Sequence, residues 1–415
     1  MMILIAIAII FLLTPTALMG GNYNHRDLIP GGRSAFLGGA YTAIANDPSG
    51  LFFNPAGVAF SNKGEISLNT TAFYKKETKF KAAVNGQDFE EFSNANFPIS
   101  IGSLYSIGKL SLGYLILSRD FQDTIQSDYF ENIATQEDFA NTYSRFQQES
   151  TLYQLYGLGF AVNIGKKFSI GLSNFFYSRK RKLTIHQHAS FVNQNIFNLD
   201  QSVYSESTGG QMVFGILCNW ETFALGLSAS TIEEVMDKTT LSQDSLQISS
   251  EAETAPTNEH TELDDLAGED NLFPNTYRLG LMFNPAKFFK FSSDLVYHAE
   301  EKHLKNTSGV WDLNPVINVS IGIEFILGNM NLQAGAFTNY SAAKKIEPTP
   351  TPQPDKIDFT GYSVGIGYGL KNFGTSFGYV LQQGRGEAKK VAGVTNIQEV
   401  SSQSQTGYLS MHYYL

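Results

Sequence analysis

The feature that most restricts the fold of this chain is an alternation of apolar and polar residues with a period of two. In residues 317–325 every odd position is apolar, and the residues between are Asn318, Ser320, Gly322 and Glu324. Residues 362–368 repeat the pattern. Because successive side chains of a strand point to opposite faces, such segments predict strands with one apolar face and one small or polar face. A soluble β-sandwich and a membrane β-barrel both satisfy this pattern.

The lengths of the connections separate these two architectures. We expect fourteen strands, at about residues 66–76, 97–106, 110–119, 150–163, 168–178, 203–219, 223–230, 275–284, 289–298, 316–326, 329–339, 360–369, 373–383 and 406–415. The connections between them alternate between turns of two to four residues and much longer segments. Bacterial outer-membrane barrels have this arrangement, with short periplasmic turns and long extracellular loops.

Both ends of the chain carry features of an exported protein. Residues 3–13 form an apolar run that is shorter than the roughly 20 residues of a membrane helix and is followed by small residues, which predicts a signal peptide over residues 1–20. At the other end, Leu409, Met411, Tyr413 and Leu415 share one strand face, which resembles the assembly signature of outer-membrane barrels. We therefore expect an all-β, 14-stranded antiparallel transmembrane β-barrel in a bacterial outer membrane.

Charge is concentrated in a few of the long connections. Residues 233–270 hold twelve acidic residues and one lysine, which predicts a solvated, mobile external loop. The prolines of residues 347–355 favour a stiff polyproline-II spacer at the cell surface. The basic run of residues 179–182, at the outer end of a strand, either binds phosphate groups of lipopolysaccharide or is a solvated rim.

Three motifs that could indicate catalysis or ligand binding are better explained by their positions on strands. Ser363 stands in a Gly-x-Ser-x-Gly motif but inside a strand, so the chain is not expected to be an enzyme. Gly365, Gly367 and Gly369 share one strand face, where we expect them to leave room in the lumen. His186 and His188 would share a face if their strand continues beyond the membrane. With no third ligand in view, we expect no metal site, and nothing calls for a cofactor.

The segment Asn54-Pro55-Ala56-Gly57, preceded by Gly32-Arg33, Gly38-Gly39-Ala40 and Asn46-Asp47, resembles the N-terminal region of the FadL family. These proteins are outer-membrane transporters for long-chain fatty acids and aromatic hydrocarbons. The resemblance implies a small helical hatch inside the lumen, here residues 21–62, within a barrel of residues 63–415 with long extracellular loops. The matching hatch residues are Asp47, Asn54, Pro55, Ala56 and Gly57. Their types fit short helices, because Pro48 and Pro55 can begin a helix and Asp47 and Asn54 can cap one.

The resemblance also implies a function. In the family, a hydrophobic ligand enters from outside, passes a lumenal pocket gated by the N-terminal segment and leaves through the barrel wall. Here that segment is about residues 21–30, with Tyr23, His25 and Leu28 as the candidate gating residues. The leading hypothesis is passive uptake of hydrophobic small molecules. The alternatives are a non-transporting barrel for docking or secretion, as in similar PorV-type proteins, and a non-specific porin. We expect a monomer that contacts outer-membrane lipid and lipopolysaccharide and binds no nucleic acid.

Overall fold

The computed structural model describes the chain from residue 23 to residue 415, with several internal gaps. The gaps are residues 26–27, 62–63, 85, 96–97, 135–138, 221, 249–255, 267–273, 303–311, 349–352 and 390–396. The signal peptide expected over residues 1–20 lies outside the described residues. None of the helices in the described part is long and apolar enough to cross a bilayer.

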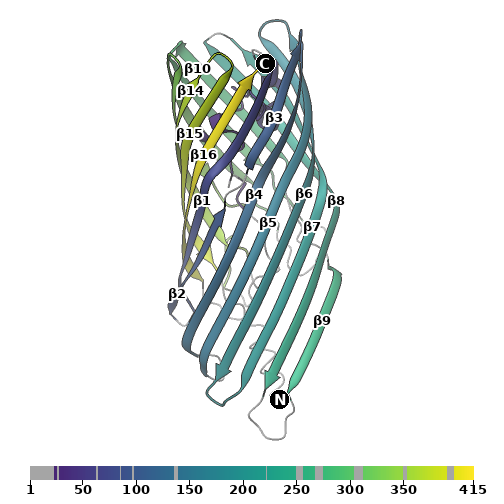
Figure 1. Ribbon diagram of the computed structural model, residues 1–415, viewed down its shortest axis with the longest axis vertical. Helices are drawn as coiled ribbons and strands as arrows, with labels where there is room; N and C mark the ends of the chain where they lie inside the picture. Colours follow the sequence, from purple (N-terminus) through teal and green to yellow (C-terminus); the bar gives the residue numbers. More distant parts are fainter. Residues whose placement is uncertain are drawn as a thin grey trace.

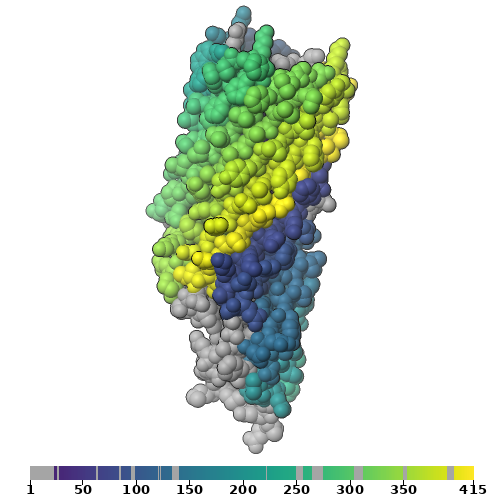
Figure 2. Space-filling view, turned by 90° about the vertical axis from the view of Figure 1, so that its left-hand side faces the viewer, coloured from purple at the N-terminus to yellow at the C-terminus, as the bar shows by residue number. Residues whose placement is uncertain are grey.

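Fourteen antiparallel strands close into one barrel, as predicted (Figure 1). In ring order these strands are β1 (Glu65–Val84), β3 (Pro98–Ile107), β4 (Leu110–Ala134), β5 (Phe139–Ile164), β6 (Phe168–Phe191), β7 (Ile196–Asn219), β8 (Phe223–Ile248), β10 (Thr276–Ala286), β11 (Phe289–His298), β12 (Val316–Leu327), β13 (Met330–Asn339), β14 (Lys356–Gly369), β15 (Phe373–Ala388) and β16 (Gln398–Tyr414). The β1–β16 pairing closes the ring, and Figure 2 shows yellow β16 against the dark blue first strand. Two further strands, β2 (Gln87–Ala95) and β9 (Thr257–Leu266), each pair with one neighbour, β1 and β8 respectively.

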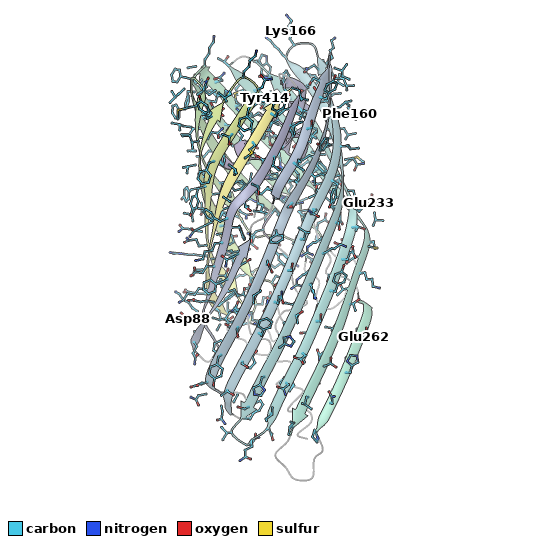
Figure 3. The ribbon with its side chains drawn as sticks, in the orientation of Figure 1. Asp88, Phe160, Lys166, Glu233, Glu262 and Tyr414 are labelled. Atoms are coloured by element: carbon cyan, nitrogen blue, oxygen red, sulfur yellow. The ribbon has the colours of Figure 1, made fainter. Side chains whose placement is uncertain are left out.

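The outward faces form an apolar belt around the end of the barrel that carries the short turns. On β12 the side chains of Ile317 and Ile321 are about half exposed, whereas Asn318 and Ser320 face inward and are buried. Exposed apolar side chains that face lipid and buried polar ones that face the lumen are typical of an outer-membrane barrel. Phe160 marks this belt in Figure 3, and Glu262 marks the opposite end of the molecule.

The long connections predicted as loops are in large part continuations of the strands. β4 to β8 extend far beyond the belt, and β9 pairs with the end of β8. We call residues 120–152, 179–206 and 233–266, as far as they are described, the hairpin extension; it forms the lower part of Figure 1. The acidic segment expected to be a solvated loop is therefore a β-hairpin in its described part.

The alternation reverses where β6 leaves the belt, and this explains the error. In the belt Leu172 and Phe176 point outward, and the small Gly171 points inward. In the hairpin extension Leu183 and Ile185 are buried inside and polar residues point outward, because the outer solvent is water instead of lipid. A prediction that requires apolar residues on the outer face therefore ends this strand at residue 178, too early by thirteen residues.

The basic run of residues 179–182 is also divided between the two faces of β6. Arg179 and Arg181 point inward and are buried, and Arg181 Nε lies 2.7 Å from Glu149 Oε1. Lys180 points outward and pairs with Glu206 at 3.0 Å. The run is thus not a single basic patch for phosphate groups.

The predicted helical hatch lies inside the barrel, as the purple elements of Figure 1 show. It consists of two short helices, α2 (Gly32–Phe36) and α3 (Gly50–Phe53), and the 3₁₀ helix η1 (Pro55–Phe60). Most residues of these helices are fully buried. The hatch therefore fills the lumen at the level of the apolar belt.

Candidate transport site

The barrel wall around the hatch is built from glycines that face each other across neighbouring strands. The directly opposite pairs are Gly113–Gly159, Gly171–Gly215, Gly226–Gly280, Gly322–Gly335 and Gly365–Gly378. A Cβ atom at Gly226 would lie 2.3 Å from the Thr42 carbonyl oxygen, and one at Gly335 would lie 2.4 Å from Gly38 N. Because a Cβ atom cannot approach backbone so closely, these glycines allow the hatch to pack directly on the strands.

The three glycines of β14 leave room on the lumenal face, Gly365 for the hatch and Gly367 and Gly369 for a cavity beside it. A Cβ atom at Gly365 would lie 2.3 Å from the Phe36 ring of the hatch. At Gly367 the nearest neighbour would be Ser376 of the adjacent strand, at 3.4 Å, and at Gly369 it would be Asn329. Ser363 of the same strand donates a hydrogen bond to the Phe36 carbonyl at 2.8 Å. This serine is therefore an anchor for the hatch.

Asn54 ties the hatch to the wall. Its Oδ1 atom accepts a hydrogen bond from Ala56 N and so caps η1, where Pro55 is the first residue. Its Nδ2 atom donates to the carbonyls of Thr42 in the hatch and Ile216 in β7, at 2.9 and 3.1 Å. One fully buried amide therefore holds three backbone groups.

The other hatch-motif residues fix the path of the chain around Asn54. Ala56 O accepts a hydrogen bond from Ser169 of β6, and a Cβ atom at Gly57 would lie 2.5 Å from Ala45 O. Asp47 Oδ1 accepts from Ser49 N at 2.9 Å. Since α3 begins only at Gly50, Asp47 caps the turn that leads into this helix and not the helix itself.

Two carboxylates of the barrel bind the hatch from inside the lumen. Glu324 of β12 forms a two-point ion pair with Arg33, and it also accepts from Gln333 and lies 3.4 Å from Lys290. The charge of the Arg33 guanidinium is thus balanced inside the lumen by the buried Glu324 carboxylate. Asp294 of β11 accepts from Tyr41 N and Thr42 N at 3.0 and 2.9 Å.

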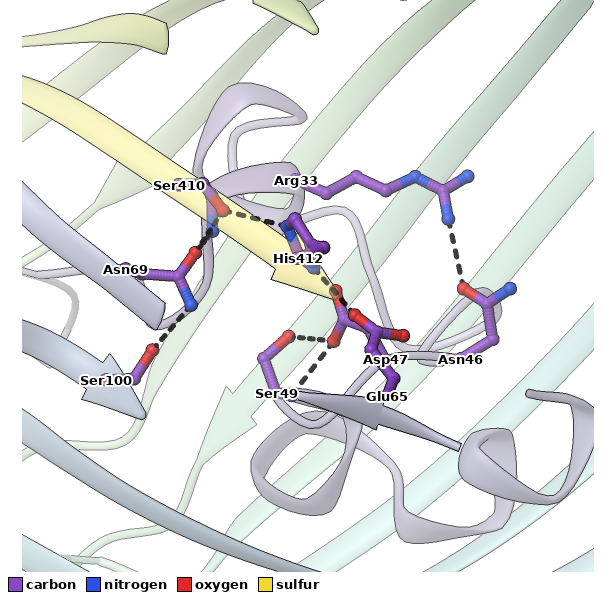
Figure 4. Close-up of polar contacts among 10 residues, drawn as sticks. Arg33, Asn46, Asp47, Ser49, Glu65, Asn69, Ser100, Ser410 and His412 are labelled. Atoms are coloured by element: carbon purple, nitrogen blue, oxygen red, sulfur yellow. Dashed lines mark hydrogen bonds and ion pairs between the residues drawn. The ribbon is translucent and has the colours of Figure 1, made fainter. Parts of the chain in front are cut away.

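A polar chain joins the start of the hatch to the strands that close the barrel (Figure 4). Asn69 Oδ1 accepts from Gly32 N and Ser410 Oγ, and His412 Nδ1 lies 2.6 Å from Glu65 Oε1. Next to it, on the side of the short turns, is a cavity of about 370 Å³ lined largely by charged and polar residues, including Arg33, Asp47, Glu65 and His412. This side of the hatch is unsuited to an apolar ligand.

The opposite side of the hatch is apolar and aromatic. Phe52 and Phe53 of α3 meet Phe175 of β6 and Tyr41, with Phe52–Phe175 and Tyr41–Phe53 ring centroids 6.5 and 5.6 Å apart. Farther along the strands, Tyr153 and Tyr177 form an edge-to-face pair at 5.7 Å. We call five of these side chains, Phe52, Phe53, Tyr153, Phe175 and Tyr177, the aromatic layer; all are buried in one apolar cluster.

Three arginines lie within or beside the aromatic layer. The Cζ atom of Arg278 is 5.3 Å from the Phe52 ring centroid and 5.9 Å from that of Phe53. The Cζ atom of Arg119 is 5.7 Å from the Tyr153 ring, and Arg179 pairs across the strands with Tyr153. Cationic groups beside an aromatic surface can bind an anionic group whose apolar part packs on the rings.

Two of the three candidate gating residues of the N-terminal segment, Tyr23 and His25, contact directly paired residues of the wall, Val316 and His298. Leu28 is buried in the same apolar cluster as the aromatic layer. Tyr23 packs near Leu313, Val316 and Ala342, and the His25 ring lies against His298 at an angle of 37°, with ring centroids 4.3 Å apart. Leu28 therefore lies in the cluster that contains the aromatic layer, and Tyr23 lies close enough to Arg179 for the two side chains to interact electrostatically.

The barrel wall changes its construction between β2 and β4. β3 pairs with β4 only as far as Ser100–Leu117, and β2 continues the wall but pairs with β1 alone among the described residues. Side chains bridge β2 and β4 instead: Ser93 Oγ donates to Asp123 O at 3.1 Å, and Gln126 Nε2 donates to Glu90 O. A β-bulge at Ser118–Asp120 marks the start of this β2/β4 seam.

Comparison with solved structures identifies the fold type of this barrel. No protein-family model matches the sequence, and no curated protein sequence matches it. Among solved structures, a FadL homologue of Pseudomonas aeruginosa covers 93% of this chain and 98% of its own, with a TM-score of 0.63 and 13% identity. The chain has the FadL-type fold. The Pseudomonas putida toluene transporter TodX (TM-score 0.60, 11% identity, 94% and 99% covered) and the monoaromatic hydrocarbon channel CymD (0.58, 13%, 94% and 98%) agree.

Within this FadL-type barrel, the sequence identified the hatch motif but missed its partners on the wall. Asn54 could be found because a cap and the following proline are local signals. Glu324 and Asp294 could not be paired with Arg33 and Thr42, which are 291 and 252 residues away along the chain. The only sequence signal for them is an acidic residue on the lumenal face of a strand, which for Glu324 stands beside the small Ser320 and Gly322.

Proposed function

We propose that the protein is an outer-membrane channel for passive uptake of hydrophobic small molecules. The observation that carries this proposal is the difference between the two sides of the hatch. The outer side has an aromatic layer with three arginines beside it, and the side of the short turns has a cavity lined largely by charged and polar residues. An apolar ligand gains free energy when it leaves water for the aromatic layer, and it gains none from the polar side. The FadL-type fold agrees with this role.

The preferred ligand is a long-chain amphiphile with one carboxylate, such as a fatty acid. The aromatic layer would take the alkyl chain, and Arg119, Arg179 or Arg278 would bind the carboxylate. An uncharged aromatic hydrocarbon would use the rings but not the guanidinium groups. The three arginines therefore favour the fatty acid of the two classes.

We infer a sideways route out of the barrel at the β2/β4 seam. The direct route through the hatch is closed by the glycine-lined contacts and by the bonds to Glu324, Asp294 and Asn54. At the seam only side chains join the two strands, so opening it would break no backbone ladder within the described residues. A ligand released there enters the bilayer and avoids water.

A non-transporting barrel used for docking, as in PorV-type proteins, is the second candidate. The observation in its favour is that the hatch is attached at many points, as expected of a permanent plug. The hairpin extension would then be the docking surface.

Ligand binding and uptake separate the two candidates. The protein would be purified in detergent and its co-purified lipid analysed, and uptake of labelled palmitate and toluene would be measured in cells that produce it. We expect bound fatty acid in wild type, and palmitate uptake that falls about tenfold or more in Arg278→Ala, as expected for loss of a charge-assisted hydrogen bond. Toluene uptake should change little.

Removal of residues 23–30 should alter palmitate uptake, while the barrel stays folded as judged by its migration in unheated gels. Absence of bound lipid and uptake no higher than in cells without the protein would exclude transport and leave docking. Equal losses of palmitate and toluene uptake in Arg278→Ala would contradict the carboxylate-binding role.

A further inference from the structure

His186 and His188 lie on the outer face of β6, well away from the lipid. The outward-facing Phe176 of the apolar belt precedes His186 by ten residues on the same strand, which is on the order of 30 Å of extended chain. Both histidines are exposed. The strand thus continues beyond the membrane, which was the condition for these two imidazoles to share one face in water.

Each imidazole is held by an oxygen atom of the next strand. His186 Nδ1 lies 2.6 Å from Asp200 Oδ1, and His188 Nδ1 lies 2.6 Å from Asn198 Oδ1, both on β7. A carboxylate oxygen only accepts, so Nδ1 of His186 carries the hydrogen, and Nε2 of the neutral ring keeps its lone pair. The amide oxygen of Asn198 has the same effect on His188.

A stacking contact further restricts the first of these rings. His186 stacks on Phe146 of β5, its direct neighbour across the strands, with ring centroids 5.8 Å apart and an angle of 28°. Imidazoles that bind metals usually donate their second nitrogen to a carboxylate or carbonyl oxygen, which fixes the ring orientation. His186 and His188 therefore already have the outer partners of metal ligands.

The surroundings of the two histidines suit a cation. A surface hollow of about 430 Å³ is lined by His186, His188, Asn198, Asp200 and Asp244, among others. Asp200 and Asp244 face each other directly across β7 and β8, and each contacts an imidazole, of His186 and His260 respectively, so two carboxylates lie beside the two histidines. No three metal-ligating side chains converge in the described part of the chain. Two imidazoles and water would therefore complete the coordination.

We propose that the Nε2 atoms of His186 and His188 bind one divalent transition-metal ion, with Asp200 and Asn198 as positioning residues. Imidazole ligands favour Zn²⁺, Ni²⁺ and Cu²⁺ over Mg²⁺ or Ca²⁺, which prefer oxygen ligands. Alternate residues of a strand place their side chains on one face about 7 Å apart, close enough for two imidazoles to share one ion. The site is on the cell-surface side of the barrel and is independent of the proposed transport function.

The test is calorimetric titration of the full-length, untagged barrel in detergent with Zn²⁺ and with Cu²⁺. Wild type should bind one ion per chain at this site, and His186→Gln or His188→Gln should weaken binding at least tenfold. Asp200→Asn should weaken it by a factor of about 10 to 100, as expected for a lost outer partner. The Cu²⁺ electron paramagnetic resonance spectrum should show two nitrogen ligands in wild type and one in either histidine variant.

His260→Gln is the matched control, because His260 makes the same 2.6 Å contact to a carboxylate, Asp244 of β8, but has no second histidine two residues away on its strand. Binding should be unchanged in this variant. Unchanged gel migration of every variant without heating would confirm that the barrel is folded. The proposal is overturned if wild type binds no ion below about 1 mM, or if the double variant H186Q/H188Q binds as wild type does.

Discussion

Arg33 of the hatch and Glu324 of β12 form a two-point ion pair inside the barrel, with Nε–Oε1 and Nη2–Oε2 distances of 3.0 and 2.7 Å. Only 2% of the Glu324 side chain and 22% of the Arg33 side chain is exposed. The pair joins the first helix of the hatch to a strand on the lumenal wall. It is therefore the contact whose loss should most directly loosen the plug.

Glu324→Gln should destabilise the hatch while the barrel remains closed. The change leaves Arg33 and Lys290 near each other without the carboxylate between them, and removal of one partner of a buried ion pair costs about 3 kcal/mol or more. We expect transient channel openings in planar bilayers and faster protease cleavage within residues 31–60. Glu206→Gln, which removes the exposed pair with Lys180, should have neither effect. Identical conductance in E324Q and wild type would show that the pair does not hold the plug.

Gly226→Ala should destabilise the packing between hatch and wall. The added methyl group would lie 2.3 Å from the Thr42 carbonyl oxygen, which belongs to backbone and cannot turn away. Forcing extra atoms into such a contact costs about 1–3 kcal/mol. The measurement is the temperature at which the folded barrel unfolds in detergent. Gly367→Ala is the control, because its nearest contact is an ordinary 3.4 Å from Ser376; equal shifts in the two variants would contradict the role of the glycine pairs.

The sequence predicts a strand correctly where its outer face has the same surroundings, lipid or water, along the whole strand. In β12 the outward residues contact lipid along the whole strand, so the alternation of Ile317, Val319 and Ile321 marks the strand correctly. In β6 the outer solvent changes from lipid to water near Arg179, and the apolar face moves from outside to inside. The alternation therefore continues with the opposite sense, and a prediction that expects apolar residues outside ends the strand at this point.

For the candidate site, prediction from the sequence is limited to contacts between residues that are close along the chain. The Asn54 cap involves Ala56, two residues away, and the residue types alone predict it. The bond from Asn54 to Ile216 and the five glycine pairs depend on which strand residues face each other. Register is set by the whole barrel, so no local pattern contains it.

Asn54→Asp and Asn54→Ala should separate the two roles of this residue. Aspartate retains an oxygen to cap η1 but has no donor for Thr42 O and Ile216 O, whereas alanine loses both functions. We expect alanine to weaken the docking of the hatch by the loss of the two donated hydrogen bonds and by about 1 kcal/mol more, the usual cost of losing an N-cap. Aspartate adds an unpaired buried charge, so it should destabilise the hatch at pH 7 and less at pH 4. Hydrogen exchange of the hatch amides measures both; a pH-independent difference between the variants would contradict this account.

Joining β2 to β4 should block uptake if ligand leaves through the seam. Ser93 of β2 contacts the backbone of Asp123, and Thr124 follows on the inward face of β4, so Ser93→Cys with Thr124→Cys places two thiols across the seam. The native Cys218 would first be replaced by serine. A short bifunctional reagent that joins the thiols through disulfide bonds should then stop palmitate uptake, and reductant should restore it.

Thr78→Cys with Ser402→Cys is the matched control, since the native hydroxyls lie 2.8 Å apart on β1 and β16, strands already joined by a backbone ladder. Uptake that persists in the joined seam variant would place the exit elsewhere.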